Sequence, residues 1–210
     1  MKGHATPGCV LGATAMLTLM LPVPGGAAAG LPLSGVAEVA TDQFGHAAET
    51  AAPARVTVYF RGDDLRIEFD DDQGARRALL AVRGAPVAWV MDGHAGAMPV
   101  ANTPWPLRFD PGAPCAGLGM FADCQAIERG KVAGRDAVQW RYRLSSPRGP
   151  GRSSRGRMWL DAQTGFVLGY SAHTGAGRPR QWRVEQVRYG TAPDALFDPP
   201  AMPVRSASAP

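Results

Sequence analysis

Histidine, serine and aspartate are the side chains that could support catalysis or metal binding in this chain of 210 residues. The histidines beyond residue 30 are His46, His94 and His173, and none is spaced like the metal-binding pair H-x-x-x-H. No serine lies in the G-x-S-x-G motif of a hydrolase nucleophile. Residues 70–72 are Asp-Asp-Asp, but no EF-hand ligand spacing follows them, so a charged turn is the better interpretation. We therefore expect a protein that is not an enzyme and that holds no metal or cofactor.

Two cysteines, Cys115 and Cys124, lie in the middle of the chain. They are too far apart for a Cys-x-x-Cys redox motif, and a metal site would need more ligands than this pair provides. In an oxidising compartment we expect them to form a structural disulfide, which would stabilise the fold by about 2–3 kcal/mol.

Residues 1–29 have the features of a secretory signal peptide: Lys2 without acidic neighbours, an apolar run at 9–23 and an Ala-rich end at 27–29. The apolar run is shorter than the roughly 20 residues of a membrane span, and Pro22 and Pro24 disfavour an uncleaved anchor. We expect cleavage near Ala29, export to the periplasm and no membrane-spanning segment afterwards. Residues 30–204 would form a single domain, followed by a disordered tail at 205–210.

Arginine is concentrated in the second half of the chain. Residues 30–125 contain 7 Arg and 12 acidic residues, a balance of −5, whereas residues 126–190 contain 12 Arg and one Lys against 4 acidic residues, a balance of +9. This asymmetry either marks a surface for anions, lipid headgroups or an acidic partner, or serves only solubility. The candidate surface consists of Arg141, Arg143, Arg157, Arg180 and Arg183. Nucleic acid is not an expected partner of an exported protein.

These side chains must be positioned by β-strands, because apolar and polar residues alternate along most of the chain. In residues 54–69, ARVTVYFRGDDLRIEF, two alternating runs flank a short polar turn, which is typical of a hairpin with one dry and one wet face. Residues 156–170 show the same pattern. At residues 35–41 a strand is favoured over a short helix, and a β-bulge near Glu185-Gln186 explains a change of face in the last strand.

The expected fold is mainly β: a strongly curved antiparallel sheet of about 8–11 strands that forms an open half-barrel. The proline-containing segment 102–112 interrupts the strands, and residues 116–127 are expected to carry a short helix with Met120 and Phe121. This segment would either form a lid over one end of the sheet or be an irregular surface excursion. The apolar face expected to line the interior consists of Val56, Val58, Phe60, Leu65, Ile67, Phe69, Trp89, Met91, Trp140, Tyr142, Phe166 and Leu168. These residues fit either a hollow interior that holds a ligand or a solid core.

Three motifs resemble those of the outer-membrane lipoprotein carrier and sorting superfamily, the LolA/LolB-like proteins. They are YFRGDDLRIE at 59–68, MWLDAQTG at 158–165 and ALFDP at 195–199, and in this order they cover roughly residues 35–204. The resemblance implies a half-open antiparallel barrel with a lid and an apolar cavity that shields acyl chains in the periplasm. The long N-terminal amphipathic helix of the carriers is not evident, which is consistent with another periplasmic branch. Arg66 matches the hairpin motif, but its position between Leu65 and Ile67 places it on the wet face.

Two functions fit this combination of features. The first is an exported binding protein that holds a lipid, an acyl chain or another hydrophobic ligand in the concave sheet, in lipoprotein sorting or as an envelope chaperone. The alternative is an envelope-stress sensor or another protein-interaction domain that uses the arginine-rich face without a small ligand. In both cases we expect a monomer, and the sequence does not identify the ligand or the partner.

Overall fold

The computed structural model describes residues 33–44, 53–92, 96–102, 106–116, 119–147, 149, 152–173 and 180–200. The chain divides into two units, Met1–Leu31 and Pro32–Pro210, and every described residue belongs to the second. The expected signal peptide at 1–29 and the expected tail at 205–210 lie outside the described residues. Within the described part, no helix is long and apolar enough to cross a membrane.

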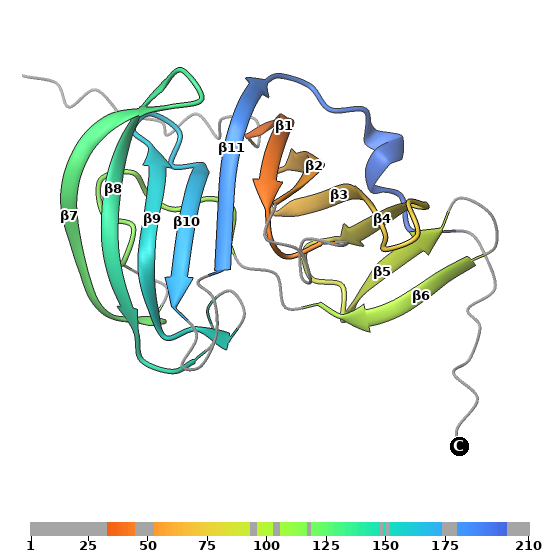
Figure 1. Ribbon diagram of the computed structural model, residues 1–210, viewed down its shortest axis with the longest axis horizontal. Coiled ribbons are helices and arrows are strands. Elements are labelled where there is room, and N and C mark those ends of the chain that lie inside the picture. Colours follow the sequence, from red (N-terminus) through yellow and green to blue (C-terminus); the bar gives the residue numbers. More distant parts are fainter. Residues whose placement is uncertain are drawn as a thin grey trace, which may run out of the picture. The chain divides into compact units, whose positions relative to one another are not determined.

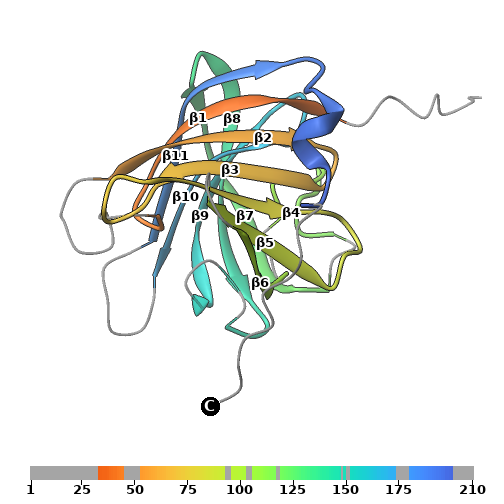
Figure 2. The same ribbon diagram turned by 90° about the vertical axis from the view of Figure 1, so that its right-hand side faces the viewer.

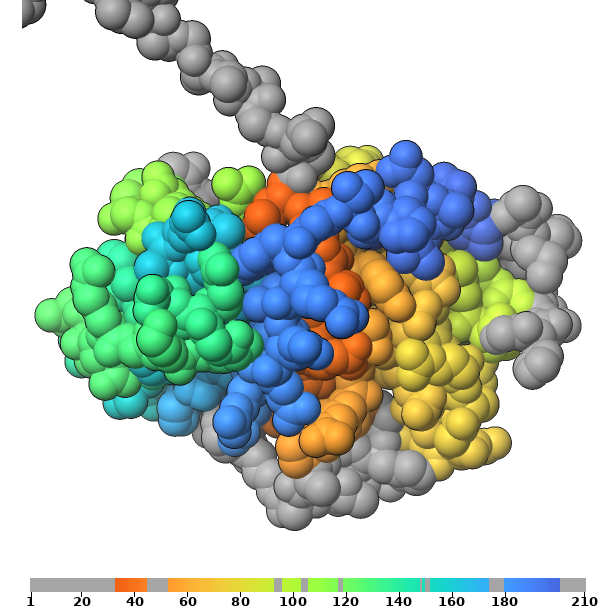
Figure 3. Space-filling view, turned by 90° about the horizontal axis from the view of Figure 1, so that it is seen from above, coloured from red at the N-terminus to blue at the C-terminus, as the bar shows by residue number. Residues whose placement is uncertain are grey.

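The described residues contain an 11-stranded antiparallel sheet (Figure 1). In chain order the strands are β1 (Ser34–Thr41), β2 (Ala54–Arg61), β3 (Asp64–Asp70), β4 (Arg76–Ala81), β5 (Val87–Asp92), β6 (Gly96–Ala101), β7 (Phe121–Val132), β8 (Arg135–Leu144), β9 (Arg155–Asp161), β10 (Val167–His173) and β11 (Arg180–Tyr189). Their order across the sheet is β6-β5-β4-β3-β2-β1-β11-β10-β9-β8-β7. The sheet therefore consists of two meanders, β1–β6 and β7–β11, which meet where β11 lies beside β1 (Figure 3).

The sheet is strongly curved and is not closed, because β6 and β7 lie at its two ends (Figure 2). The curvature brings the ring of Phe60 in β2 onto that of Phe166, which directly precedes β10, with the ring centroids 4.4 Å apart. In the sheet order, β1 and β11 separate these two strands. The predicted mainly-β half-barrel with sequential antiparallel strands is confirmed.

The concave face of this sheet carries the main hydrophobic core. In β2, Val56, Val58 and Phe60 are buried, while the residues between them are partly exposed. In the neighbouring β3, Leu65 and Ile67 are buried opposite Phe60 and Val58. Removing such a side chain from water contributes about 1.5–3 kcal/mol, so the alternation in the sequence determines which face turns inward.

Two local predictions are confirmed and one is wrong. Residues 34–41 form the strand β1, as favoured from the sequence. The bulge is present: Glu38 stands opposite Gln186 and the next residue, Val39, opposite Val184, so Glu185 has no counterpart in β1. The helix expected within residues 116–127 is replaced by the strand β7, which pairs along its length with β8.

A smaller hydrophobic cluster lies on the convex face. The 3₁₀-helix η3 (Asp194–Phe197) brings Phe197 against Leu80 of β4, and Ala192 completes the buried set. The guanidinium of Arg61 lies 4.6 Å from the centroid of the Phe197 ring and 2.6 Å from a carboxylate oxygen of Asp194. The C-terminal segment therefore covers part of the convex face.

Candidate functional site

All but two of the residues predicted to line the interior belong to the concave hydrophobic cluster. These residues are Val56, Val58, Phe60, Leu65, Ile67, Phe69, Trp140, Tyr142, Phe166 and Leu168. Phe60 and Phe166 are each 1% exposed, and Val58 and Leu168 are 0% exposed. Because these side chains already pack against other groups, the deeper part of the concave face has the properties of a solid core.

Trp89 and Met91 lie on the convex face, so the prediction that they face the interior is wrong. Their neighbours across the β4–β5 pair are Leu80 and Ala78, and both pack against the cluster around Leu80 and Phe197. The alternation in β5 does not reveal the correct face, because the residues on both sides of this strand are apolar.

A pocket of about 520 Å³ opens at one end of the concave face. It is enclosed by the β2–β3 turn, the β4–β5 turn and residues 106–108. Leu65 and Ala81, which belong to the concave core, and Leu107, which packs against that core, provide apolar lining. The volume lies within the range of small-molecule sites in proteins. We call this hollow the mouth pocket.

Asn102 holds the β4–β5 turn at the rim of the mouth pocket. Its Nδ2 donates hydrogen bonds to the carbonyl oxygens of Val82 at 3.1 Å and Ala85 at 2.8 Å. Its Oδ1 is buried and has no hydrogen-bond partner in the described part of the chain. A buried acceptor without a donor costs about 1–3 kcal/mol, so a donor group of a ligand would be stabilised there.

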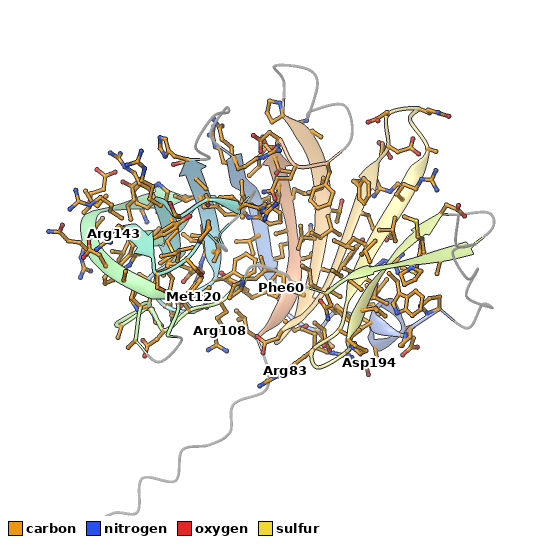
Figure 4. All side chains as sticks on the ribbon, turned by 90° about the horizontal axis from the view of Figure 1, so that it is seen from below. Phe60, Arg83, Arg108, Met120, Arg143 and Asp194 are labelled. Atoms are coloured by element: carbon orange, nitrogen blue, oxygen red, sulfur yellow. A yellow bond between two sulfur atoms is a disulfide. The ribbon has the colours of Figure 1, made fainter. Side chains whose placement is uncertain are left out.

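Arg83 and Arg108 carry positive charge at the rim and lie at the same end of the sheet (Figure 4). A guanidinium nitrogen of Arg83 is 3.2 Å from a carboxylate oxygen of Asp63, and Nε of Arg108 donates to the carbonyl oxygen of Thr164 at 3.0 Å. Arg108 and Asp63 also line a second hollow of about 620 Å³. Asp63 and Asp64 also line the mouth pocket, and Asp63 pairs with Arg83, so Arg108 is the rim guanidinium without an ion pair in the described part of the chain.

The segment between β6 and β7 is attached to the β9–β10 turn by backbone hydrogen bonds. The N–H of Phe109 donates to the carbonyl oxygen of Gly165 at 3.0 Å. The N–H of Val167 donates to the carbonyl oxygen of Leu107 at 2.8 Å. Gly165 has a φ of 72°, and a Cβ at this position would overlap the carbonyl oxygen of Phe109, so glycine is required. These bonds hold Leu107 at the mouth pocket and Phe109 in the core.

Met120 and Phe121, predicted to form a lid, lie where β7 begins. The ring of Phe121 contacts that of Tyr142 edge-on, with the centroids 5.9 Å apart. The predicted disulfide between Cys115 and Cys124 is present, with the Cα atoms 6.1 Å apart. The disulfide therefore ties the irregular segment to an edge strand instead of to a helix.

Two indole N–H groups are buried without an acceptor among the described residues, those of Trp140 and Trp182. Trp182 was not predicted as a site residue, although it belongs to the concave core and stacks on Tyr170 with the ring centroids 6.1 Å apart. Burial also raises the pKa of the neighbouring concave residue Tyr142 to about 12, so its phenol is neutral at physiological pH.

Three of the arginines predicted as a partner surface come together on the convex face. Arg141 and Arg143 of β8 and Arg157 of β9 line a pocket of about 390 Å³, together with Arg155 and His173. We call this hollow the arginine pocket. Arg143 lies far from Arg83 and Arg108 (Figure 4), so the arginine pocket and the mouth pocket are separate sites.

The other two predicted arginines do not line the arginine pocket. Arg183 lies on the convex face of β11, opposite Gly169 of β10. The arginine pocket reaches only as far as β10, through His173. Arg180 stands opposite Ala172, which is part of the concave core, and its Nη1 donates to the carbonyl oxygen of Asp42 at 3.3 Å. The prediction that Arg180 belongs to the same surface as Arg141, Arg143 and Arg157 was therefore wrong.

Metal-ligating side chains are not gathered in the described part of the chain, where no group of three or more His, Cys, Asp and Glu is placed to hold an ion. His46 and His94 lie outside the described residues, and His173 is exposed at the end of β10. No protein-family model and no curated protein sequence matches the chain.

The chain is similar to several solved structures at low sequence identity. MucB is 18% identical, with a TM-score of 0.41 over 82% of this chain and 58% of its own. The MucA/MucB complex of Pseudomonas aeruginosa is 19% identical, with a TM-score of 0.38 and 56% of that chain covered. A LolA superfamily protein from Nitrosomonas europaea is 10% identical, with a TM-score of 0.36 over 80% of this chain and 90% of its own. The chain thus spans less than two thirds of the length of MucB.

Proposed function

We propose that this protein binds an elongated apolar ligand with an anionic head group, such as a fatty acyl chain, at the mouth pocket. One observation carries the proposal: the apolar lining of the pocket is continuous with the concave core, while Arg83 and Arg108 line its rim. Transfer of an acyl chain from water to such a surface gains about 0.8 kcal/mol per methylene group. Guanidinium groups at the rim would bind a carboxylate or phosphate through charge-assisted hydrogen bonds.

The packed core limits how far a ligand would enter. Phe60 and Phe166 lie deeper than Leu65 and are already buried against each other. A long chain would therefore have to separate them before it gained further contact.

The biological role proposed for this binding is the handling of lipids or lipoprotein acyl chains in the periplasm. Two features support the location: the signal-peptide pattern of residues 1–29 and the Cys115–Cys124 disulfide. Disulfides persist in oxidising compartments such as the periplasm and are rare in the cytosol. Arg108, which forms no ion pair in the described part of the chain, supports an anionic amphiphile over a neutral hydrocarbon.

A fluorescent fatty acid tests this proposal by titration against the purified protein. Leu107→Arg introduces a charge where the chain would lie and is expected to weaken binding at least tenfold, since Leu107 is a half-buried lining residue. Met98→Arg is the matched control, because Met98 is 60% exposed and does not line the pocket. Its affinity for the probe should equal that of the unchanged protein.

The head group is tested by comparing a fatty acid with the alcohol of the same chain length as competitors for the probe. Arg83→Gln/Arg108→Gln should weaken competition by the acid and leave that by the alcohol unchanged. If the unchanged protein bound no probe at micromolar concentrations, or if Leu107→Arg bound it as well as Met98→Arg does, the mouth pocket would not be the ligand site.

A further inference from the structure

The convex face of β8 and β9 places like charges directly opposite each other. Arg141 stands across from Arg157, and Arg143 stands across from Arg155, in consecutive pairs on the same face. Directly opposed like charges destabilise an antiparallel strand pair. Two such pairs side by side therefore require an explanation other than the stability of the sheet.

None of these four arginines forms an ion pair with a carboxylate in the described part of the chain, although Asp123 lies in the same pocket. The hydrogen bond found for them joins Nη2 of Arg141 to the neutral Oε1 of Gln125, at 2.5 Å. Elsewhere the protein pairs its arginines with acids: Arg66, Arg77 and Arg135, for example, lie 3.0, 2.9 and 2.8 Å from carboxylate oxygens. The positive charge of β8 and β9 is thus concentrated and available to a ligand.

The four arginines surround the arginine pocket, whose remaining lining is Asp123, Tyr142, Gly156 and His173. The acidic residue in the lining of the arginine pocket is Asp123, which lies on the edge strand β7 opposite Arg143 of β8. No described aliphatic residue lines this pocket, and its charged groups are four guanidiniums and one carboxylate, so the pocket suits an anionic group. It differs in this respect from the mouth pocket.

The spacing of the arginines matches an extended peptide. Arg141 and Arg143 are two residues apart on β8, as are Arg157 and Arg155 on β9, so the pairs repeat every ~6.7 Å along the strands. An extended peptide presents alternate side chains on one face with the same repeat. Carboxylates at alternate positions of such a peptide would each meet one pair of guanidinium groups, which bind carboxylates in a bidentate manner.

We propose that the arginine pocket binds an extended acidic segment of a partner protein that carries Asp or Glu at alternate positions. The segment would lie along β8 and β9, with successive carboxylates at the 143/155 and 141/157 pairs. A single inorganic anion would satisfy one pair only. This site is independent of the proposed ligand site, because the two lie on opposite faces of the sheet.

Fluorescence anisotropy with two labelled decapeptides of equal charge tests the proposal. In one peptide Glu and Ser alternate, and in the other five Glu precede five Ser. The alternating peptide is expected to bind at least fivefold more tightly, and its affinity should fall as NaCl is raised from about 50 to about 200 mM, because exposed charges are screened. Arg141→Gln/Arg157→Gln should weaken binding at least tenfold.

The matched control is Arg129→Gln/Arg188→Gln, which removes the same charge from two exposed arginines outside the pocket. This control should bind the alternating peptide like the unchanged protein. Equal weakening by the two double variants, or equal affinity for the two peptides, would show general charge attraction and overturn the proposal. Binding to anionic phosphatidylglycerol vesicles that requires Arg141 and Arg157, without peptide binding, would overturn it in favour of a lipid surface. Fatty-acid binding by all variants should be unchanged, which separates this test from that of the mouth pocket.

Discussion

Asp161, at the end of β9, is a buried carboxylate held by several donors. It accepts hydrogen bonds from Nε of Arg135 at 2.8 Å, from the hydroxyl of Tyr189 at 2.9 Å, and from the N–H groups of Gln163 and Thr164 at 2.9 and 3.0 Å. Burial alone would raise the pKa of Asp161, but Arg135 and the other donors outweigh it, so the pKa lies below its usual value. Asp161 therefore stabilises the fold above about pH 4, and this contribution is lost as the pH falls through the lower pKa of the folded state.

Asp161→Ala is expected to lower the free energy of unfolding at pH 7 by about 2–4 kcal/mol, because buried donors lose their acceptor. Urea denaturation followed by tryptophan fluorescence measures this loss. Asp136→Ala is the control: it removes an exposed carboxylate 2.7 Å from Nζ of Lys131 and should cost less than about 1 kcal/mol. If Asp161→Ala lowered the free energy of unfolding as much at about pH 2 as at pH 7, the electrostatic explanation would be contradicted.

Alternation in the sequence predicted the orientation of single residues where one face of a strand is dry and the other wet. It succeeded for Val58 and Ile67, whose strand neighbours are partly exposed. It failed for Trp89 and Met91, because the convex side of β5 is covered by the segment that contains Phe197. That cover comes from more than a hundred residues later in the chain, so no local pattern reveals it.

Among the structural elements, the irregular segment before β7 depends on the Cys115–Cys124 disulfide. Cys115→Ser/Cys124→Ser is expected to lower the free energy of unfolding by about 2–3 kcal/mol, since the bond closes a short loop between residues nine positions apart. Chemical denaturation with and without dithiothreitol measures the effect. The reductant should destabilise the unchanged protein and leave the double variant unaffected. Equal stability of the reduced and oxidised proteins would show that the disulfide does not support the fold.

The 3₁₀-helix η3 anchors the C-terminal segment through Phe197, which is 2% exposed. Phe197→Ala should destabilise the protein by about 3–5 kcal/mol, because it leaves a cavity against Leu80. Asp198→Ala alters an exposed neighbour and should change stability by less than about 0.5 kcal/mol. Thermal unfolding measured by circular dichroism compares the two variants, and similar midpoints would show that η3 does not hold the convex face.

The sequence predicted β1, the β2–β3 hairpin and the bulge at Glu185, because these depend on local alternation. It predicted a helix in place of the start of β7. Most of β7 is exposed, because it is an edge strand with a single partner, and its apolar residues do not alternate regularly. The mouth pocket was not predicted, since Ala81, Asn102 and Leu107 come from separate segments that only the folded chain brings together.

At the scale of the whole molecule, the curved sheet gives its two faces different chemistry. The concave face is apolar and opens at the mouth pocket, whereas the convex face carries the arginine pocket at one end and η3 at the other. An antiparallel meander with one dry face was predictable from the sequence. The pairing of β1 with β11 at the centre of the sheet was not predictable, because these two strands lie at opposite ends of the described chain.

The pairing of β1 with β11 has a consequence for how the chain reaches its folded state. The hydrogen bond from Oγ1 of Thr41 to the carbonyl oxygen of Gln181 joins residues 140 positions apart. Contacts of such long sequence separation slow folding, because the entropy of loop closure is lost before the contacts form. Until β1 and β11 pair, the inner edges of both meanders are exposed to pairing with other chains. The pairing of β1 with β11, which unites the sheet, is therefore also a point at which a newly made chain is prone to aggregate.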